Sequence, residues 1–343
     1  MARRPTIQDV ADAAGVSVAT VDRVLNGRLK VREETARKVS EAAQRVGYHA
    51  VNLIEQRLRA ELPELRMGFV LQEASHAFYH ALAGEAVYCA DQLARTRGQA
   101  IIQFAQTQSP SEVADLMRKM RGRVDAVAAA AVNHSRVTEA VIALKAEGIP
   151  TYAMLNDFAQ GERHAYIGLN NLKVGRTAAW MLGTAAPKPG KIAIFVGGPG
   201  WHGHALRETG FRSHFREARP EFEVIDTIVN LETKKLTYDA TSEILSKHKD
   251  LVGLYVAGGG MEGAIQAIRE RRGPGEIALV VNELTPESRT ALAEGYVTMV
   301  IATPMRAICT ELMAMMRSVV LGPEPATQGQ LFLEPVIYVP ESV

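Results

Sequence analysis

Apolar residues near the start of the chain recur at the three- and four-residue spacing of buried helix faces. This pattern predicts three short helices, at 7–14, 18–26 and about 33–46. Gly15 and Gly47 are placed to end the first and third of them. Two short helices joined by a Gly-centred turn form a helix-turn-helix, in which the second helix is the one that enters the DNA major groove.

The second of these helices has one side that needs a core and one side that does not. Val21, Val24 and Leu25 lie at the spacing of a single buried stripe. The residues left on the outward side are Val18, Ala19, Asp22, Arg23 and Asn26. An outward face that places an acid beside a base suggests a surface with a binding partner.

From residue 66 onward, short β-rich runs alternate with helical stretches. The predicted strands are 66–72, 99–105, 125–132, 150–155, 191–196, 223–229, 252–257, 277–282 and 297–302. Such alternation is typical of parallel sheets with helices on both faces, and this many strands exceed one comfortable sheet. We therefore predict an α/β domain of two lobes, with a ligand in the crevice at the carboxyl ends of the strands.

Together these patterns divide the 343 residues into three parts. They are an all-α helix-turn-helix headpiece at 1–49, a linker at 50–64 and a two-lobed domain at 65–343. A content of 47% hydrophobic and 22% charged residues fits a globular protein. No apolar run is long enough for a membrane span and the N-terminus lacks a secretory signal, so we expect a cytoplasmic protein without a membrane partner.

Charge and cysteine content add little to this picture. The headpiece has nine Lys and Arg against six Asp and Glu, a surplus of three, while the whole chain has a net charge of +1. That surplus fits a phosphate-binding surface and a solvated helical face almost equally well. Cys89 and Cys309 lie in apolar helical patterns without metal-ligand spacing, so we expect buried thiols.

The sequence TIQDVADAAGVSVATVDRVLN at the start of the chain closely resembles the DNA-binding headpiece of the lactose repressor (LacI/GalR) family of bacterial regulators. The resemblance assigns base reading to Val18, Ala19 and Arg23, and phosphate contacts to Ser17, Thr20 and Asn26, with Thr6 as a further candidate. This division agrees with the chemistry, because Arg donates two parallel hydrogen bonds to guanine and small apolar groups pack on a thymine methyl.

Asp22 departs from the family pattern, which usually has Ser at this position. A carboxylate cannot donate to a phosphate. Three contacts remain open to it: a cytosine amino group, the neighbouring Arg23, or the basic pair Arg3 and Arg4. Either the operator preference is altered or the substitution is a tolerated solvent-facing one.

The linker resembles the family's hinge helix, which binds the minor groove as a pair in the operator complex. Asn52 and Leu58 match that pattern, and Leu58 would be the apolar wedge at the central base step. Glu55 and Gln56 replace the usual Ala-Arg, and Arg57 or Arg59 would have to compensate.

The rest of the chain resembles the family's sugar-binding regulatory domain, which is itself similar to periplasmic sugar-binding proteins. The resemblance and the positions at strand ends give these candidate ligand-binding residues: Phe78, Tyr79, Asn133, Asn156, Asp157, Trp201, Arg207, Glu262 and Glu283. Planar polar groups suit vicinal hydroxyls, and aromatic faces suit the C–H side of a sugar ring. Gly258, Gly259 and Gly260 stand where relatives have an Asn-Asp pair, so no particular sugar follows.

Enzymatic alternatives have weaker support. The run GGPGWHGH at 197–204 lacks a Walker Lys-Ser/Thr and a correctly spaced dinucleotide fingerprint, which favours a ligand-facing loop covered by Trp201. His202 and His204 have no matching third ligand, so we expect no metal site and no cofactor. A sugar-binding protein or sugar-modifying enzyme with a DNA-binding head stays as the alternative.

The sequence thus predicts a transcriptional regulator, most simply a repressor, that binds palindromic double-stranded operator DNA as a homodimer. Its operator affinity would respond to a small polyhydroxylated effector: a sugar, a polyol or a sugar acid. No catalytic residues are expected. The C-terminal sequence LEPVIYVPESV has no leucine repeat of the tetramerising kind, which favours a dimer.

Overall fold

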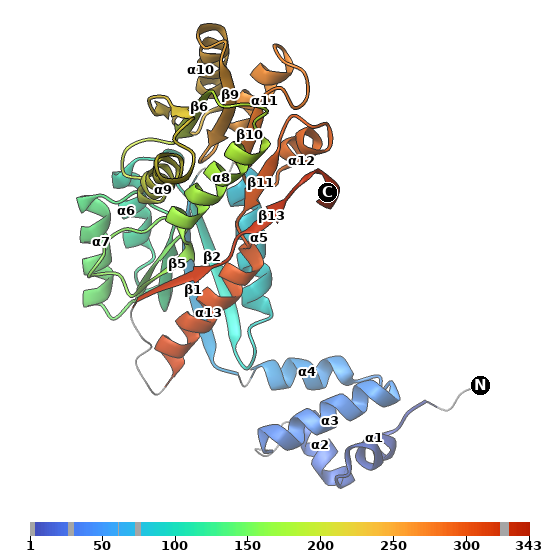
Figure 1. The fold of residues 1–343 in the computed structure, drawn as a ribbon. Coiled ribbons are helices and arrows are strands. Elements are labelled where there is room, and N and C mark those ends of the chain that lie inside the picture. Colours follow the sequence, from blue (N-terminus) through green and yellow to red (C-terminus); the bar gives the residue numbers. More distant parts are fainter. Residues whose placement is uncertain (1–3, 27–30, 61, 73–76, 323–328) are drawn as a thin grey trace. The chain divides into compact units, whose positions relative to one another are not determined.

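The computed structural model describes residues 4–26, 31–60, 62–72, 77–322 and 329–343, apart from the side chains of residues 33 and 55–59. The chain separates into two compact units (Figure 1). Unit 1 comprises residues 1–65 and 91–99, and unit 2 comprises residues 66–90 and 100–343. Among the described residues, no helix combines the length and apolar character needed to cross a bilayer.

Unit 1 contains a small helical core. Its helices are α1 (Ile7–Ala14), α2 (Val18–Asn26), α3 (Glu33–Val46) and α4 (Val51–Ala60). Val10, Val21 and Val39 are fully buried against one another, and Ile54 adds α4 to the same cluster. The three helices predicted from the sequence are therefore confirmed, and their apolar stripes form a common core.

Local hydrogen bonds explain where these helices begin and end. Thr6 and Asp9 form a capping box at the start of α1, and Gly15 ends this helix, as predicted, with a left-handed φ of 65°. The Oγ of Ser17 accepts the Thr20 N–H at 3.2 Å and so caps the start of α2. Arg32 precedes α3 without a side-chain cap.

Unit 2 contains two sheets, and we call each sheet with its helices a lobe. Lobe 1 has the strand order β12-β5-β4-β3-β1-β2. Its elements are β1 (Glu64–Leu71), α5 (Ala77–Asp91), β2 (Arg97–Phe104), α6 (Pro110–Lys119), β3 (Ala126–Ala129), α7 (Ser135–Ala146), β4 (Thr151–Met154), β5 (Ala165–Leu169), α13 (Met305–Leu321) and β12 (Gly329–Leu333). Helices α6 and α7 pack on one side of this sheet. Helix α13 contacts β5 and is joined to α5 by an ion pair between Arg306 and Glu85.

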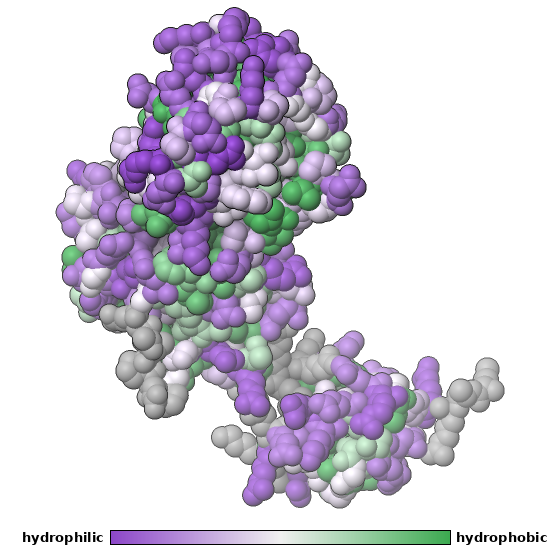
Figure 2. All heavy atoms as spheres, in the orientation of Figure 1, coloured by the Kyte–Doolittle hydropathy of each residue, from purple (hydrophilic) through white to green (hydrophobic). Residues whose placement is uncertain are grey.

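Lobe 2 has the strand order β13-β11-β10-β9-β6-β7, and β8 also pairs with β6. Its elements are α8 (Asn171–Ala185), β6 (Lys191–Val196), α9 (His202–Ala218), β7 (Glu223–Val224), β8 (Ile228–Val229), α10 (Lys234–Lys247), β9 (Leu251–Val256), α11 (Met261–Arg269), β10 (Ala278–Asn282), α12 (Pro286–Ala293), β11 (Met299–Ala302) and β13 (Val336–Tyr338), followed by the 3-10 turn η1 (Pro340–Ser342). Helices α8 and α9 cover one face of this sheet, and α10, α11 and α12 cover the other. Figure 2 shows hydrophilic side chains over the outer surface of α10, at the top of the view, as expected for a covering helix.

The predicted fold class, two α/β lobes with parallel sheets, is confirmed, with differences at the edges. The prediction missed β5, β12 and β13, and β13 runs antiparallel to β11. The single strand predicted at 223–229 is in fact two short strands, β7 and β8, both paired with β6. The chain passes between the lobes after β5, between β11 and α13, and between β12 and β13 (Figure 1).

Candidate functional site

The outward face of α2 carries the residues that the sequence predicted. Ala19, Arg23 and Asn26 are exposed, whereas Val18 is half-buried against the helical core. Arg23 makes no hydrogen bond or ion pair with another described residue, so its five donors face solvent. An unpaired Arg on an exposed helix face is available to an external acceptor.

The small polar residues on this face are paired with one another. Asp22 accepts a hydrogen bond from the Asn26 side chain at 2.6 Å, a contact that the sequence did not suggest. Ser17 and Thr20 share a hydroxyl hydrogen bond at 2.9 Å. Asp22 thus orients Asn26 rather than Arg23.

The linker forms helix α4, and it exposes Asn52. The side chain of Leu58, the predicted wedge, lies outside the described residues, as do those of the neighbouring positions 55–59. For the linker the structure therefore establishes a helix and the position of Asn52.

A second candidate site is a cavity of about 490 Å³ within unit 2. Its wall is made from residues that follow strands of both lobes. Leu155 and Asn156 follow β4, and Trp201, Gly203, His204 and Arg207 follow β6. Glu232 follows β8, Gly258 to Gly260 follow β9, Glu283 follows β10 and Thr303 follows β11. This is the crevice at the carboxyl ends of the strands, where α/β folds bind ligands.

Seven of the nine predicted ligand-binding residues line this cavity. They are Phe78, Tyr79, Asn156, Trp201, Arg207, Glu262 and Glu283. Asn133 and Asp157 are not on its wall. Asn133 is exposed, and its side-chain oxygen accepts the Ala159 N–H at 3.3 Å.

Asp157 forms a buried ion pair with Arg163 and does not line the cavity. Arg163 donates to both of its oxygens, and Gln160 and Gln330 add hydrogen bonds at 2.9 Å each. Burial by itself would raise the pKa of Asp157, but these donors hold it below its usual value. The structure thus gives Asp157 a role in fixing the loop after β4.

Three non-glycine residues of the cavity wall have a strained backbone conformation, which is typical of a ligand-binding site. Leu155, Glu232 and Glu283 line the cavity with φ angles of 67°, 57° and 71°, in the left-handed region that non-glycine residues rarely adopt. Strained backbone positions persist only where the surrounding structure holds them, and they are concentrated at ligand-binding sites.

Arg207 and Glu283 are both fixed by neighbours. Arg207 donates to the side chain of Asn171 at 2.7 Å and to the carbonyl of Ala257 at 2.6 Å, which leaves part of its guanidinium for a ligand. Glu283 accepts from the Thr303 N–H at 2.9 Å and from the Thr303 hydroxyl. Burial nevertheless raises the pKa of Glu283 above its usual value.

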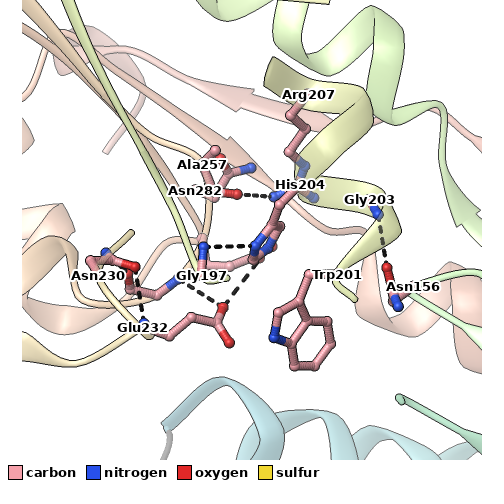
Figure 3. A network of polar contacts seen from close by, with 12 residues as sticks. Asn156, Gly197, Trp201, Gly203, His204, Arg207, Asn230, Glu232, Ala257 and Asn282 are labelled. Atoms are coloured by element: carbon pink, nitrogen blue, oxygen red, sulfur yellow. Dashed lines mark hydrogen bonds and ion pairs between the residues drawn. The ribbon is translucent and has the colours of Figure 1, made fainter. Parts of the chain in front are cut away.

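His204 and Glu232 also line the cavity, and the sequence prediction did not include them among the ligand-binding residues. Figure 3 shows the Glu232 carboxylate pointing toward the imidazole of His204, with Oε1 and Nε2 at 3.8 Å. The Gly197 N–H donates to Nδ1 of His204 at 3.1 Å, so the proton of the neutral ring sits on Nε2 and faces Glu232. Burial lowers the pKa of His204 to about 4.

The glycine run at 258–260 is part of the same arrangement. The Gly259 N–H donates to Glu232 Oε1 at 3.1 Å, so this backbone amide is already paired within the chain. Glu232 follows a strand just as Glu283 does, which is the signal that would have found it. Among the described residues, no group of three or more His, Cys, Asp and Glu is arranged to hold a metal ion.

Two family models match the chain in agreement with this architecture. Residues 67–324 match the periplasmic binding protein domain, and residues 6–50 match the bacterial regulatory proteins of the lacI family. The chain belongs to the periplasmic binding protein domain family and carries a lacI-family domain at its N-terminal side. The helix-turn-helix of unit 1 is therefore the lacI-family domain, and the two lobes form the periplasmic-binding-protein-like domain.

Known regulators resemble parts of this chain. The HTH-type transcriptional regulator GalS of Salmonella typhimurium is 29% identical over 181 residues, which cover 52% of this chain and 50% of GalS. Catabolite control protein A of Priestia megaterium is 41% identical over 78 residues, or 23% of each chain. The chain thus spans about half of the length of the first relative and less of the second.

Solved structures resemble the periplasmic-binding-protein-like domain in fold. A solute-binding protein of Burkholderia graminis in complex with D-arabinose has a TM-score of 0.75 at 17% identity, covering 82% of this chain and 97% of that one. A second, from Actinobacillus succinogenes with bound D-allose, has a TM-score of 0.73 at 19% identity and covers 81% and 98%.

Proposed function

We propose that this protein is a sequence-specific transcriptional regulator, a repressor that binds operator DNA as a homodimer in the cytoplasm. A small polyhydroxylated effector in the cavity would control its affinity for the operator. The observation that carries this proposal is the presence, in one chain, of a lacI-family headpiece with an unpaired Arg23 and a cavity walled by strand ends of two lobes.

On the headpiece, we assign base contacts to Val18, Ala19 and Arg23. The orienting phosphate contacts are assigned to Thr6, Ser17, Thr20, Asn26 and Asn52. Support comes from the exposure of Ala19, Arg23, Asn26 and Asn52 and from the position of the hydroxyl groups at helix starts.

In the cavity, we assign ligand contacts to the seven predicted residues on the wall and add His204 and Glu232. Polar groups there would bind hydroxyls, and Tyr79 and Trp201 offer aromatic faces to a sugar ring. Two structures of the same fold contain a bound monosaccharide, D-allose or D-arabinose, which supports an effector of this class.

Selection of bound sequences from random DNA, followed by Arg23 variants at fixed salt, tests the DNA assignment. We expect a palindromic site and a loss of about 1–3 kcal/mol in Arg23→Ala, with relaxed preference at one base pair. Arg23→Lys is the matched control, since it keeps the charge and loses the planar fork. If Arg23→Ala weakened binding to all sequences uniformly and left the base preference unchanged, Arg23 would be a phosphate contact.

A further inference from the structure

One glutamine of lobe 1 reaches two groups of lobe 2 at the cavity. Gln108, which lies just before α6, accepts a hydrogen bond from Trp201 Nε1 at 3.2 Å and donates to Glu232 Oε2 at 3.2 Å. An indole N–H only donates and an ionised carboxylate only accepts, so these partners dictate the orientation of the carboxamide. A single side chain thus bridges the two lobes.

The loop that carries Trp201 is attached to lobe 1 at other points as well. The Asn133 N–H donates to the carbonyl of Gly200 at 2.9 Å, and the Gly203 N–H donates to Asn156 Oδ1 at 2.8 Å (Figure 3). These bonds need no ligand, because both partners belong to the chain. The segment 200–203 is therefore held against lobe 1 by the protein alone.

Trp201 connects this attachment to the cavity wall. Its side chain is 6% exposed, lines the cavity, and stacks on His204 with ring centroids 5.8 Å apart. Glu232, the other partner of Gln108, lies in the loop between β8 and α10 and faces His204 (Figure 3). Loss of Gln108 would remove the hydrogen-bond partner of the Trp201 indole N–H and one donor to the Glu232 carboxylate, and so loosen two parts of the wall.

We propose that Gln108 is a positioning residue that joins the two lobes, acting through Trp201 and Glu232. By stabilising the assembled wall, it would raise the fraction of molecules ready to bind the effector, and apparent affinity scales with that fraction. This inference deepens the proposed effector site and rests on it. Its test uses neither ligand nor DNA, so its failure is distinguishable from failure of the proposed function.

Tryptophan fluorescence reports on this contact directly. The chain has two tryptophans, and Trp180 is 54% exposed, so Trp180→Phe leaves Trp201 as the probe. In this background we expect acrylamide quenching of Trp201 to rise about twofold or more in Gln108→Leu, with a red-shifted emission, because two hydrogen bonds are lost. Gln106→Leu, at an exposed position two residues away, is the matched control and should match the parent.

An exchange of donor and acceptor separates positioning from general structural support. Gln108→Glu places two carboxylates together and should raise quenching. The double variant Gln108→Glu/Glu232→Gln reverses donor and acceptor. The carboxylate introduced at position 108 can still accept from the indole, so this variant should restore parental quenching. A merely structural effect of the single change would not be reversed by the second.

Each result decides the matter. Raised quenching in both single variants with recovery in the double variant supports the proposal. Parental quenching in Gln108→Leu, or a double variant no better protected than Gln108→Glu, overturns it. Circular dichroism checks the fold, and if Gln108→Leu does not fold, the comparison of Gln108→Glu with the double variant decides.

Discussion

His204 shows how a single buried side chain links the cavity to acidity. Its side chain is 12% exposed and has a neutral partner at Nδ1, so the protonated form is disfavoured despite the nearby Glu232. Its pKa is about 4 in the folded chain against 6.5 for an ordinary His. Between these values the unfolded chain therefore binds more protons than the folded one.

The sign of the resulting pH dependence follows from linkage. His204 lowers the free energy of unfolding as the pH falls from 6.5 toward 4, by up to about 3 kcal/mol for a shift of this size. We expect His204→Gln to lose this dependence, so that its stability relative to the parent rises on acidification. Urea unfolding at pH 7 and pH 4.5 measures it, with the exposed His80→Gln as control. Parallel pH profiles for parent and His204→Gln would contradict the prediction.

At the same scale, most of the ligand-binding residues predicted from the sequence lie on the cavity wall, but the direction of every side chain was not predicted. Asn156 and Asp157 are consecutive residues at a strand end, and only Asn156 lines the cavity. The difference arises at Leu155, whose φ of 67° turns the chain, and at Arg163, which binds Asp157. Neither the turn nor the partner can be read from the position of a strand end.

Glycines in the helices of lobe 2 set how closely the helices approach. A Cβ on Gly175 of α8 would lie 1.9 Å from the carbonyl oxygen of Arg207 in α9, and one on Gly210 of α9 would lie 2.1 Å from that of Leu172. The two helices therefore pack backbone to backbone. Since α9 also carries His204 and Arg207, this packing positions part of the cavity wall.

Gly175→Ala is expected to destabilise the protein by about 1–3 kcal/mol or more, because two backbones would have to separate. Gly84→Ala is the matched control: it lies in helix α5 with nothing within 4 Å of an added Cβ. It should be neutral or stabilising by up to about 1 kcal/mol, through helix propensity alone. Urea unfolding measures both. If Gly175→Ala had the same free energy of unfolding as Gly84→Ala, the close packing of α8 against α9 would not contribute to stability.

At the scale of elements, the strongly patterned segments were predictable and the edges were not. Buried strands such as β6 and β9 are continuous apolar runs, which the sequence displays directly. By contrast, β12 and β13 are short edge strands with exposed Phe332, Val336 and Ile337, and their pairing depends on distant partners. The two-residue strands β7 and β8 look like one strand in the sequence because only residues 225–227 separate them, and each pairs with a different part of β6.

For the whole molecule, the proposed function requires coupling between the headpiece and the cavity. If an effector changes operator affinity by some factor, the operator must change effector affinity by the same factor. We expect this equality when fluorescence anisotropy with the selected operator is compared with calorimetric titration of the effector, with and without DNA. An effector that binds without any change in operator affinity would contradict the regulatory role.

The pairing of β12 and β13 has a consequence for how the protein is made. These strands, within residues 329–338, supply an edge to each of the two sheets, whereas the other strands of both sheets end by residue 302. On the ribosome, the helix-turn-helix is complete long before either sheet, because the lobe 1 sheet lacks β12 until Leu333 has emerged and the lobe 2 sheet lacks β13 until Tyr338 has emerged. A chain released early, before residue 329, would carry the intact helix-turn-helix and two unfinished lobes.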